Sequence, residues 1–276
     1  MAEVNVIFGP PGTGKTTELS RLVGQYVEEE GADSVAVCAF TKAAARELIG
    51  RELGIAPGQS GTLHSLCYHA LDTPPVAESQ WKLWNTTHAV YSMSDTNATD
   101  TLESGVQSRL PGDELLAELN MLRHCMRPSQ EWPEDVRQFS QAWQQWKDSQ
   151  GLIDFTDMID RARHVLPIAP GHPQTLIVDE AQDLSLLQWD LLGRWARHTT
   201  RWIAAGDDDQ ALYRWCGADF QPLLDATHRR VLPQSYRVPA RVQTQAQRYA
   251  NAIQHREPKT WAPRPAPGLL ERVYGT

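Results

Sequence analysis

Short apolar runs alternate along the chain with segments whose apolar residues follow a helical period. Glycine, acidic or hydroxyl residues follow these runs, which is typical of buried strands that end in turns. Strands that alternate with helices, with polar residues at the strand ends, predict an open parallel α/β sheet with right-handed crossovers. The predicted strands are Val4–Phe8, Ser34–Phe40, Leu176–Val178 and Trp202–Ala205.

Two predicted helices follow the first two of these strands. The first runs from Thr16 to about Val27. Thr41 is predicted to N-cap the second, which runs through Leu48, because its hydroxyl can accept hydrogen bonds from the unpaired N–H groups of the first turn. One side of the first helix carries the apolar residues Leu19, Leu22, Val23 and Tyr26.

Residues 72–150 break this alternation and are predicted to form a helical insertion. The segment is acidic and rich in tryptophan, and Glu114–Met126 and Glu134–Ser149 have amphipathic helical spacing. Tryptophans at this spacing, such as Trp143 with Trp146, more often pack in a core than bind a ligand. The α/β domain would then comprise residues 1–71 and 151–256, and the proline-rich residues 257–276 would form an extended tail or linker.

Composition narrows the class of protein. Hydrophobic residues make up 41% and charged residues 22% of the 276 residues, which excludes a disordered or fibrous chain. No apolar run approaches the roughly 18 residues of a membrane span, and the N-terminus lacks the basic start of a secretory signal. The four cysteines form no CxxC pair. We therefore expect buried thiols in a reduced, cytoplasmic protein with no membrane partner.

The net charge of −8 argues mildly against a nucleic-acid partner until it is divided along the chain. Residues 226–276 carry 9 basic and 2 acidic residues, whereas the preceding residues are acidic overall. A basic stretch on an acidic body is compatible with a local site for a polyanion. A solvated basic tail explains this charge distribution equally well.

The segment after the first predicted strand reads GPPGTGKT and fits the P-loop pattern. Its glycines let the backbone curl so that successive N–H groups converge on phosphate oxygens. Lys15 adds a charge beside the outer phosphates, and the helix that starts near Thr16 directs its positive end at them. The Thr16 hydroxyl would bind Mg²⁺. The predicted nucleotide-binding residues of this segment are Gly9, Pro10, Gly12, Thr13, Gly14, Lys15, Thr16 and Thr17.

Leu176–Glu180 supplies the matching half of such a site. A hydrophobic strand delivers Asp179 to the metal, and Glu180 beside it can polarise the attacking water. Apolar runs that end in Asp-Glu are common, so a solvated acidic turn is the alternative interpretation. Together with the P-loop, the pair favours hydrolase chemistry.

Further blocks follow one another in an order that resembles a known family. Together with the P-loop they closely resemble the UvrD/Rep-like superfamily 1 DNA helicases, over residues 9 to about 240. The blocks are Phe40–Glu47 (FTKAAARE), Thr62–Ser65 (TLHS), Asp154–Asp157 (DFTD), Asp179–Asp183 (DEAQD), Gly206–Tyr213 (GDDDQALY) and Gln234–Arg237 (QSYR).

The resemblance implies roles in ATP binding and hydrolysis. Gln210 would sense the γ-phosphate, and Arg237 offers a planar, bidentate donor set for the same group. Tyr236 would stack on the base of the nucleotide. The predicted catalytic residues are thus Lys15, Glu180, Gln210 and Arg237, and the predicted metal ligands are Thr16 and Asp179.

The resemblance also implies contact with single-stranded DNA. Phe40, Tyr213 and Trp215 would form an aromatic platform on which bases stack, a contact that tolerates any base sequence. Phe40 can also be a core residue and His64 a structural hydrogen-bonding group, so both alternatives stay open. Trp215 lies in a polar turn, where packing explains it less well. The predicted contacts to backbone phosphates are Thr41, Thr62 and His64.

The sequence departs from the family pattern in several places. Only eight residues precede Gly9, so we expect the upstream glutamine segment that reads adenine in the family to be missing. Thr17 stands where many members have an arginine against the base, and Cys216 replaces a usual arginine. The sequence ends soon after the QSYR block, so the second RecA-like domain and its arginine are expected to be absent.

The sequence therefore predicts a P-loop, RecA-like parallel sheet with helices on both faces and a helical insertion. We expect the ATP- and Mg²⁺-binding half of a DNA helicase, which contacts single-stranded DNA and needs a second RecA-like domain for unwinding. Three alternatives stay open for that domain: it is supplied in trans, the chain is a remnant that has lost it, or it belongs to a longer protein of which this sequence is a part. A nucleotide-gated DNA-binding or regulatory module without turnover is the alternative. The GDDDQ and QSYR blocks argue against a P-loop kinase or an unrelated ATPase.

Overall fold

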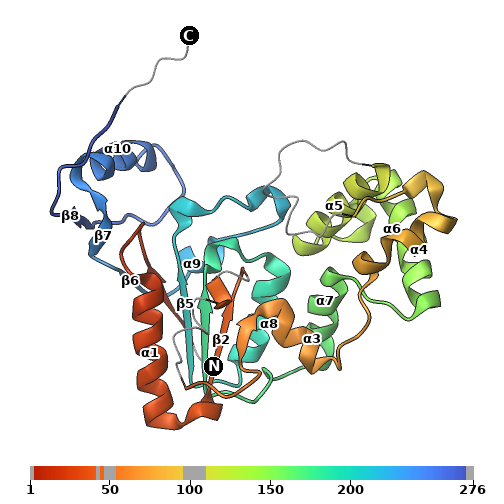
Figure 1. The fold of residues 1–276 in the computed structure, drawn as a ribbon, viewed down its shortest axis with the longest axis horizontal. Coiled ribbons are helices and arrows are strands. Elements are labelled where there is room, and N and C mark those ends of the chain that lie inside the picture. Colours follow the sequence, from red (N-terminus) through yellow and green to blue (C-terminus); the bar gives the residue numbers. More distant parts are fainter. Residues whose placement is uncertain (1–2, 42–43, 47–53, 96–109, 272–276) are drawn as a thin grey trace.

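The computed structural model describes residues 3–41, 44–46, 54–95 and 110–271, which fold around a parallel sheet (Figure 1). These residues form a six-stranded sheet with the order β3-β2-β4-β5-β1-β6, and each neighbouring pair in it is parallel. The predicted parallel α/β sheet is therefore confirmed. Its strands are β1 (Val4–Phe8), β2 (Val35–Ala39), β3 (Ser60–Thr62), β4 (Thr175–Asp179), β5 (Arg201–Gly206) and β6 (His228–Val231).

Helices cover both faces of the sheet, because successive side chains of each strand point into two different cores. In β4, Leu176 and Val178 pack into one core, whereas Ile177 packs into the other. α1 (Lys15–Glu30) covers the second core with its predicted apolar side. On the opposite side of the sheet from α1, the first core is covered by α3 (Leu63–Ala70), α7 (Phe155–Val165) and α8 (Leu186–Ala196) (Figure 1).

The predicted N-cap at Thr41 is present. Its Oγ1 accepts a hydrogen bond from the N–H of Ala44 at 3.1 Å, and residues 44–46 are helical. The predicted end of this helix at Leu48 lies outside the described residues. So do Lys42, Ala43 and Glu47 of the Phe40–Glu47 block.

The edge strands β3 and β6 are the parts of the sheet that the hydrophobic pattern does not predict. β3 reads Ser-Gly-Thr and β6 reads His-Arg-Arg-Val, so neither contains an apolar run. Each lies at an edge of the sheet and pairs with one neighbour. An edge position leaves polar side chains partly exposed, and apolar side chains are therefore not required there.

The insertion encloses a hydrophobic core of its own. Trp84, Trp143 and Trp146 are buried, and their ring centroids lie 5.0 to 5.3 Å from one another. These tryptophans are core residues, as their spacing predicts. Placing the ends of the insertion at residues 72 and 150 stays a prediction. Its helices are α4 (Trp81–Thr87), α5 (Pro111–His124) and α6 (Glu134–Gln150), with single 3₁₀ turns at Ala77–Gln80, Ala89–Tyr91 and Ser129–Glu131.

A buried cluster of charges joins the insertion to α7. The side chain of Lys147, on α6, is 1% exposed and contacts the Asp154 carboxylate at 2.6 Å and that of Asp157. Arg123, on α5, contacts the same two carboxylates at 3.0 and 2.5 Å, and Trp143 Nε1 donates to Asp154 at 2.9 Å. Burial raises the pKa of Asp154, but the charges of Arg123 and Lys147 outweigh it and hold this pKa at about 2. The carboxylate therefore stays ionised at neutral pH.

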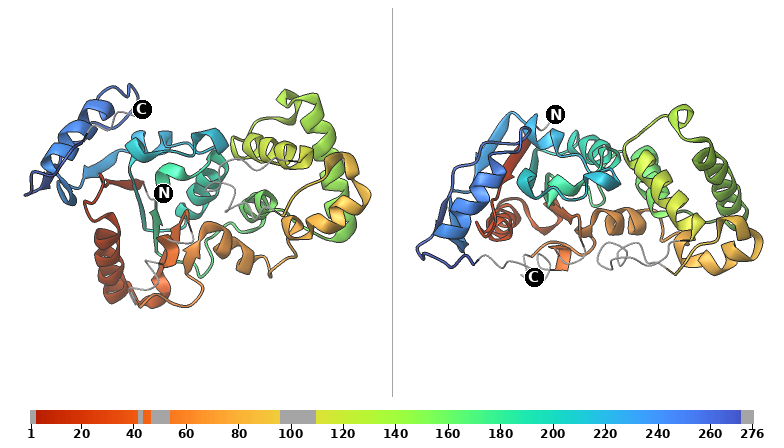
Figure 2. Two further views of the ribbon diagram at one scale, coloured as in Figure 1. Left: turned by 45° about the horizontal axis from the view of Figure 1, so that its top comes forward. Right: turned by 90° about the horizontal axis from the view of Figure 1, so that it is seen from above.

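A small C-terminal unit follows the sheet. β7 (Gln234–Pro239) and β8 (Ala262–Arg264) pair in parallel, and α10 (Ala240–Ala250) connects them. Figure 2 shows this unit and the insertion at opposite ends of the molecule. The structure differs here from the expected linker, because Lys259 and Trp261 are buried. The remaining short elements are α9 (Gln221–Leu224) and 3₁₀ turns at Ala32–Ser34, Ala181–Asp183, Asp208–Gln210 and Arg214–Cys216.

All four cysteines are thiols, and burial raises the pKa of the Cys38 thiol to about 12. Cys38 and Cys67 pack in the core between the sheet and α3. Within the described ranges, none of the helices combines the length and the apolar character that crossing a lipid bilayer requires.

Replacing Lys147 with methionine should lower the free energy of unfolding by about 3–5 kcal/mol, because it leaves the buried Asp154 with one fewer cation. Chemical denaturation of the unmutated and variant chains measures the difference. Arg137→Met, whose side chain on the same helix is 41% exposed, is the control and should change the stability far less. Equal stability of Lys147→Met and the unmutated chain would show that the cluster contributes nothing to the fold.

Candidate functional site

The parallel sheet brings the predicted site segments to one edge, the carboxyl ends of its strands. Phe8 of β1 lies beside Gly206 of β5, so the P-loop and the triple aspartate start side by side. Ala39 of β2 lies beside Asp179 of β4 and beside Thr62 of β3. This edge is where ligands bind in open α/β sheets.

The backbone of the P-loop requires glycine at particular positions. A Cβ atom at Gly9 would lie 1.7 Å from Cγ of Lys15, so only glycine lets the lysine side chain pass over the loop. Gly12 and Gly14 have φ values of +72° and +81°, a region that side chains disfavour. The loop is closed by Thr13, whose hydroxyl donates to the Pro10 carbonyl at 2.7 Å.

α1 begins directly after this loop with an N-terminus suited to an anion. Its N-cap is Gly14, and no side chain caps the helix there. The first N–H groups of a helix have no partners within the helix, and the helix dipole adds positive potential to them. The cradle of glycines and the uncapped helix therefore fit the phosphates of a nucleotide.

Lys15 and Glu180 form an ion pair at the centre of the site. Nζ of Lys15 lies 3.1 Å from Oε2 of Glu180, and the two side chains are 12% and 31% exposed. The same Oε2 accepts a hydrogen bond from the side-chain amide of Gln182 at 2.9 Å. Glu180 has φ +51°, a left-handed conformation that is strained for a non-glycine residue and is common at functional sites.

Gln182 links this ion pair to β5 and is a residue whose role the sequence did not reveal. Its Oε1 accepts the N–H of Asp207 at 3.1 Å, while its Nε2 donates to Glu180 and to Asp183. A Cβ atom at Gly206 would lie 2.7 Å from this Oε1, so glycine is needed for the contact.

Asp183 adds a titrating group beside the ion pair. Burial and the neighbouring Glu180 charge raise the pKa of its carboxyl to about 7. Its Oδ1 has no hydrogen-bond partner in the structure. A buried carboxylate with one unpaired oxygen favours its protonated form, so Asp183 changes its charge near neutral pH.

The predicted metal ligands lie close to this ion pair along the chain. Asp179 ends β4, is buried, and its Oδ1 accepts the N–H of Glu180 at 2.9 Å. Thr16 is in the first turn of α1 and is partly exposed. A hydroxyl and a carboxylate fit Mg²⁺, which takes few protein ligands and completes its shell with water and phosphate oxygens. Within the described ranges, no group of three or more His, Cys, Asp or Glu residues could hold a metal ion alone.

Gln210 lies at the end of the triple aspartate that follows β5. Its Nε2 donates to Oδ2 of Asp207 at 2.5 Å. Asp207 and Asp208 are buried, and Asp209 accepts two hydrogen bonds from Arg256 at 2.7 and 2.6 Å.

β7 brings the QSYR block onto the P-loop. Ser235 Oγ donates to the Pro11 carbonyl at 2.8 Å, and the Tyr236 N–H donates to the Gly12 carbonyl at 2.9 Å. A Cβ atom at Gly12 would lie 2.4 Å from Cβ of Arg237, so this approach also requires glycine. Tyr236 and Arg237 are therefore exposed residues that flank the phosphate-binding loop. Ser235 is buried and anchors β7 to the P-loop; it lies in the QSYR block, but the sequence alone predicts no role for it.

The predicted aromatic platform lies at the carboxyl ends of the strands, since Phe40 follows β2 and Tyr213 comes after β5. The rings of Phe40 and Tyr213 are 5.6 Å apart and tilted by 38°. Phe40 also packs against the hydrophobic core, which favours the core alternative, and its contact with DNA stays a prediction. Trp215 is 61% exposed, and Leu212 in the same loop is 73% exposed. An exposed tryptophan two residues after Tyr213 is suited to stacking on bases.

The three predicted phosphate contacts differ in their surroundings. The hydroxyls of Thr41 and Thr62 accept backbone N–H groups as helix N-caps, the latter from Ser65 at 3.1 Å. The His64 ring packs edge-on against Phe155, with centroids 6.0 Å apart. Burial lowers the pKa of His64 to about 4, so its ring is neutral at pH 7. These contacts favour a structural role for His64, and DNA contact by all three residues stays a prediction.

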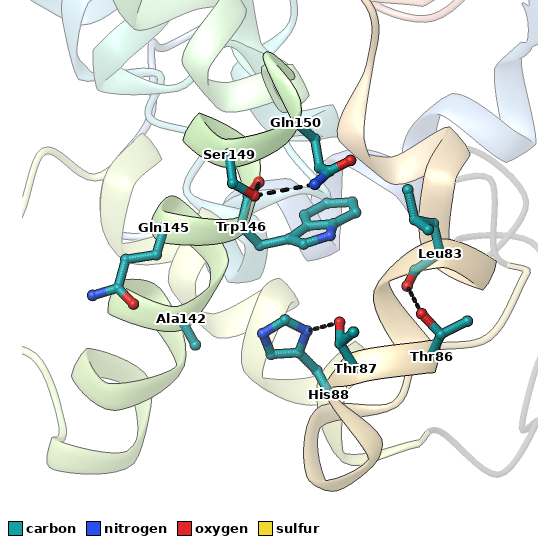
Figure 3. Close-up of a pocket in the computed structure, with 9 residues that line it drawn as sticks. All are labelled: Leu83, Thr86, Thr87, His88, Ala142, Gln145, Trp146, Ser149 and Gln150. Atoms are coloured by element: carbon teal, nitrogen blue, oxygen red, sulfur yellow. Dashed lines mark hydrogen bonds between the residues drawn. The ribbon is translucent and has the colours of Figure 1, made fainter.

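An open pocket of about 410 Å³ lies on the insertion, away from these residues (Figure 3). The side chains of α4 and α6 line it, with Leu83 and His88 on one side and Trp146 on the other (Figure 3). The His88 ring stacks on Trp84 at 3.7 Å. None of the predicted site residues is among those lining this pocket.

Comparison with known proteins gives a consistent result. The model of the family described as the UvrD/REP helicase N-terminal domain matches residues 1–230. DNA helicase II of Escherichia coli (strain K12) is 25% identical over 241 residues, which are 78% of this chain and 33% of that protein. ATP-dependent DNA helicase PcrA of Staphylococcus aureus (strain Mu50) is 26% identical over 243 residues, 79% of this chain and 33% of that protein. The chain thus spans about a third of the length of these relatives.

The family match covers most of the chain and confirms the resemblance that the sequence blocks carry. It includes the P-loop, the DEAQD segment and the triple aspartate, which the sheet brings together at one edge. The chain belongs to the UvrD/REP helicase N-terminal domain family.

Proposed function

We propose that this chain is the ATP-binding half of a superfamily 1 DNA helicase motor. In this proposal it binds ATP with Mg²⁺, contacts single-stranded DNA, and needs a second RecA-like domain for unwinding. The observation that carries the proposal is the convergence of Lys15, Glu180, Gln182 and Asp207 in one hydrogen-bonded network beside the P-loop. The names of the two relatives, both DNA helicases, support the same function.

The P-loop binds the phosphates through its backbone N–H groups and the N-terminus of α1. A triphosphate competes with Glu180 for Lys15, because both are anions within reach of the same ammonium group. Glu180 keeps its hydrogen bond from Gln182 when Lys15 moves to phosphate. Glu180 is then available to accept a proton from water, as a general base does.

The Mg²⁺ ion that accompanies ATP would neutralise charge on the phosphates when bound. Thr16 would offer its hydroxyl oxygen, and Asp179 would act through its carboxylate. Gln210 would sense the γ-phosphate through its amide, and Arg237 and Tyr236 approach from β7. Tyr236 is 74% exposed, so its ring is available to stack on a nucleotide base.

DNA contact is proposed at the aromatic loop that follows Gln210. Tyr213 and Trp215 lie three and five residues after Gln210, and Phe40 contacts the ring of Tyr213. Residues 210–215 therefore contain both the proposed γ-phosphate sensor, Gln210, and two residues of the proposed stacking platform. This proximity supports coupling between nucleotide binding and DNA contact.

The second candidate function is a nucleotide-gated DNA-binding or regulatory module without turnover. The uncapped N-terminus of α1 fits a bound nucleotide and the exposed Trp215 fits a stacked base, and neither contact requires turnover. Steady-state ATPase activity, measured with and without single-stranded DNA, separates the two functions.

Lys15→Ala should abolish nucleotide binding, whereas Glu180→Gln should keep binding and lower any hydrolysis by about 10²–10⁴. The reason is that Lys15 supplies charge to phosphate and Glu180 activates water. Fluorescent-nucleotide titration and phosphate release measure the two effects. Lys82→Ala, an exposed lysine of the insertion, is the control. Equal nucleotide affinity in Lys15→Ala and the unmutated chain would refute the P-loop assignment.

Trp215→Ala should weaken single-stranded DNA binding by roughly 1–3 kcal/mol, the usual contribution of one stacked base. Nucleotide affinity should stay unchanged, since Trp215 is not at the P-loop. A titration with a labelled oligonucleotide measures the loss. Tyr249→Ala, a similarly exposed aromatic residue on α10, serves as the control. If Tyr249→Ala and Trp215→Ala bind DNA alike, the platform lies elsewhere.

The chain alone should hydrolyse ATP well below a typical turnover of about 10 per second, with little stimulation by DNA. An arginine from the second domain would stabilise the charge that develops in phosphoryl transfer, and such a group contributes about 10³–10⁵ in rate. Steady-state phosphate release on the purified chain measures this. Fast, DNA-stimulated hydrolysis by a proven monomer would show that an internal residue such as Arg214 or Arg241 supplies this charge.

A further inference from the structure

Three consecutive carboxylates follow β5, and their cationic partners come from about fifty residues further along the chain. Asp207 and Asp208 are 0% and 6% exposed. Unpaired carboxylates are costly to bury, so this segment requires positive charge from another part of the fold. Arg256 and Lys259, in the stretch before β8, supply it.

Lys259 lies among all three carboxylates. Its Nζ is 2.9 Å from Asp207 Oδ1 and 3.0 Å from Asp209 Oδ2, and it also donates to Asp208. The side chain is 0% exposed. Burial lowers the pKa of Lys259, but the aspartates outweigh it and raise this pKa above its usual value, so the amine stays charged.

Arg256 and the backbone of residue 257 complete the clamp. Arg256 binds both oxygens of Asp209 through two N–H groups, a bidentate contact. The Glu257 N–H donates to Asp208 Oδ2 at 2.7 Å. We call residues 256–259 with these contacts the aspartate clamp. It attaches the C-terminal unit to the sheet.

The clamp reaches Gln210 through a single carboxylate. Asp207 contacts Lys259 with Oδ1 and accepts the Gln210 amide with Oδ2. The Asp207 N–H in turn donates to Gln182, which holds Glu180. The position of Lys259 therefore bears directly on the orientation of Gln210 and, through Gln182, on that of Glu180.

We propose that Lys259 and Arg256 are positioning residues for Gln210, because their positive charges beside the three aspartates set how Gln210 contacts the γ-phosphate. The inference rests on the proposed function, since it needs a triphosphate at the P-loop. The C-terminal unit would then act on the nucleotide at two places. β7 contacts the P-loop, and the aspartate clamp acts on Gln210.

Charge strengthens this inference. Three aspartates without a clamp would repel the terminal phosphate that Gln210 is to approach. Lys259 and Arg256 lie next to the three carboxylates, and their two positive charges offset two of the three negative charges. Neither cation needs to touch the nucleotide to act on it.

The chain offers a matched control within the same stretch. Arg229 of β6 donates to Glu257 at 2.8 Å, so this ion pair also attaches the stretch to the sheet. It contacts none of the three aspartates. Arg229→Gln should therefore loosen the attachment of this stretch while both cations that contact the aspartates, Arg256 and Lys259, remain in the chain.

The test is the ratio of affinities for ATPγS and ADP, both with Mg²⁺, because Gln210 contacts only the phosphate that ADP lacks. Lys259→Met should lower this ratio about tenfold, as expected for one hydrogen bond to a charged group, and should leave ADP affinity within twofold. Arg256→Gln, which removes a less buried cation, should lower the ratio about threefold. Arg229→Gln should keep the ratio of the unmutated chain. Circular dichroism establishes whether each variant is folded. If Lys259→Met is not folded, the ratio measured for Arg256→Gln decides the test.

The outcomes separate the positioning role from the proposed function. If the folded clamp variants keep the unmutated ratio, or lose ADP and ATPγS affinity equally, Lys259 and Arg256 are structural and the inference is wrong. If Arg229→Gln lowers the ratio as much as they do, attachment rather than charge is responsible, and the inference is again wrong. If the unmutated chain binds neither nucleotide, the proposed function itself fails, and the positioning role fails with it.

Discussion

Carboxylates crowd the ends of β4 and β5, and each must find a cation or a hydrogen-bond donor because unpaired buried charge is costly. This constraint organises the edge of the sheet. Glu180 is held by Lys15 and Gln182, and the triple aspartate is held by Arg256 and Lys259. The acidic residues that ATP hydrolysis would need therefore also fix how the P-loop, the sheet and the C-terminal unit fit together.

The insertion is attached by the same physical means. Lys147 and Arg123 reach the carboxylates at the N-terminus of α7, as Lys259 reaches those after β5. In both places a peripheral unit with its own small fold contributes cations to acidic residues that belong to the α/β domain. Removing one partner of such an ion pair leaves a buried charge uncompensated, which is strongly destabilising.

The sequence predicted the parts of this structure that local patterns determine. Apolar runs located β1, β2, β4 and β5, and the P-loop spacing located the phosphate cradle, because a buried parallel strand and a glycine turn each leave a local signature. The edge strands β3 and β6 carry no such pattern. Lys259 was assigned to a linker, since nothing in its proline-rich surroundings reveals three carboxylates fifty residues away. For His64, only the structure shows the burial that lowers its pKa.

The P-loop, the triple aspartate and the C-terminal unit should respond to a triphosphate as one network. Hydrogen–deuterium exchange of the purified chain, with and without ATPγS and Mg²⁺, tests this most directly, because exchange reports local opening segment by segment. Exchange should slow together in residues 9–16, 207–210, 235–237 and 256–259, and should stay unchanged in the insertion helices α4 and α6. Slowing confined to the P-loop, with none at residues 256–259, would contradict the claim.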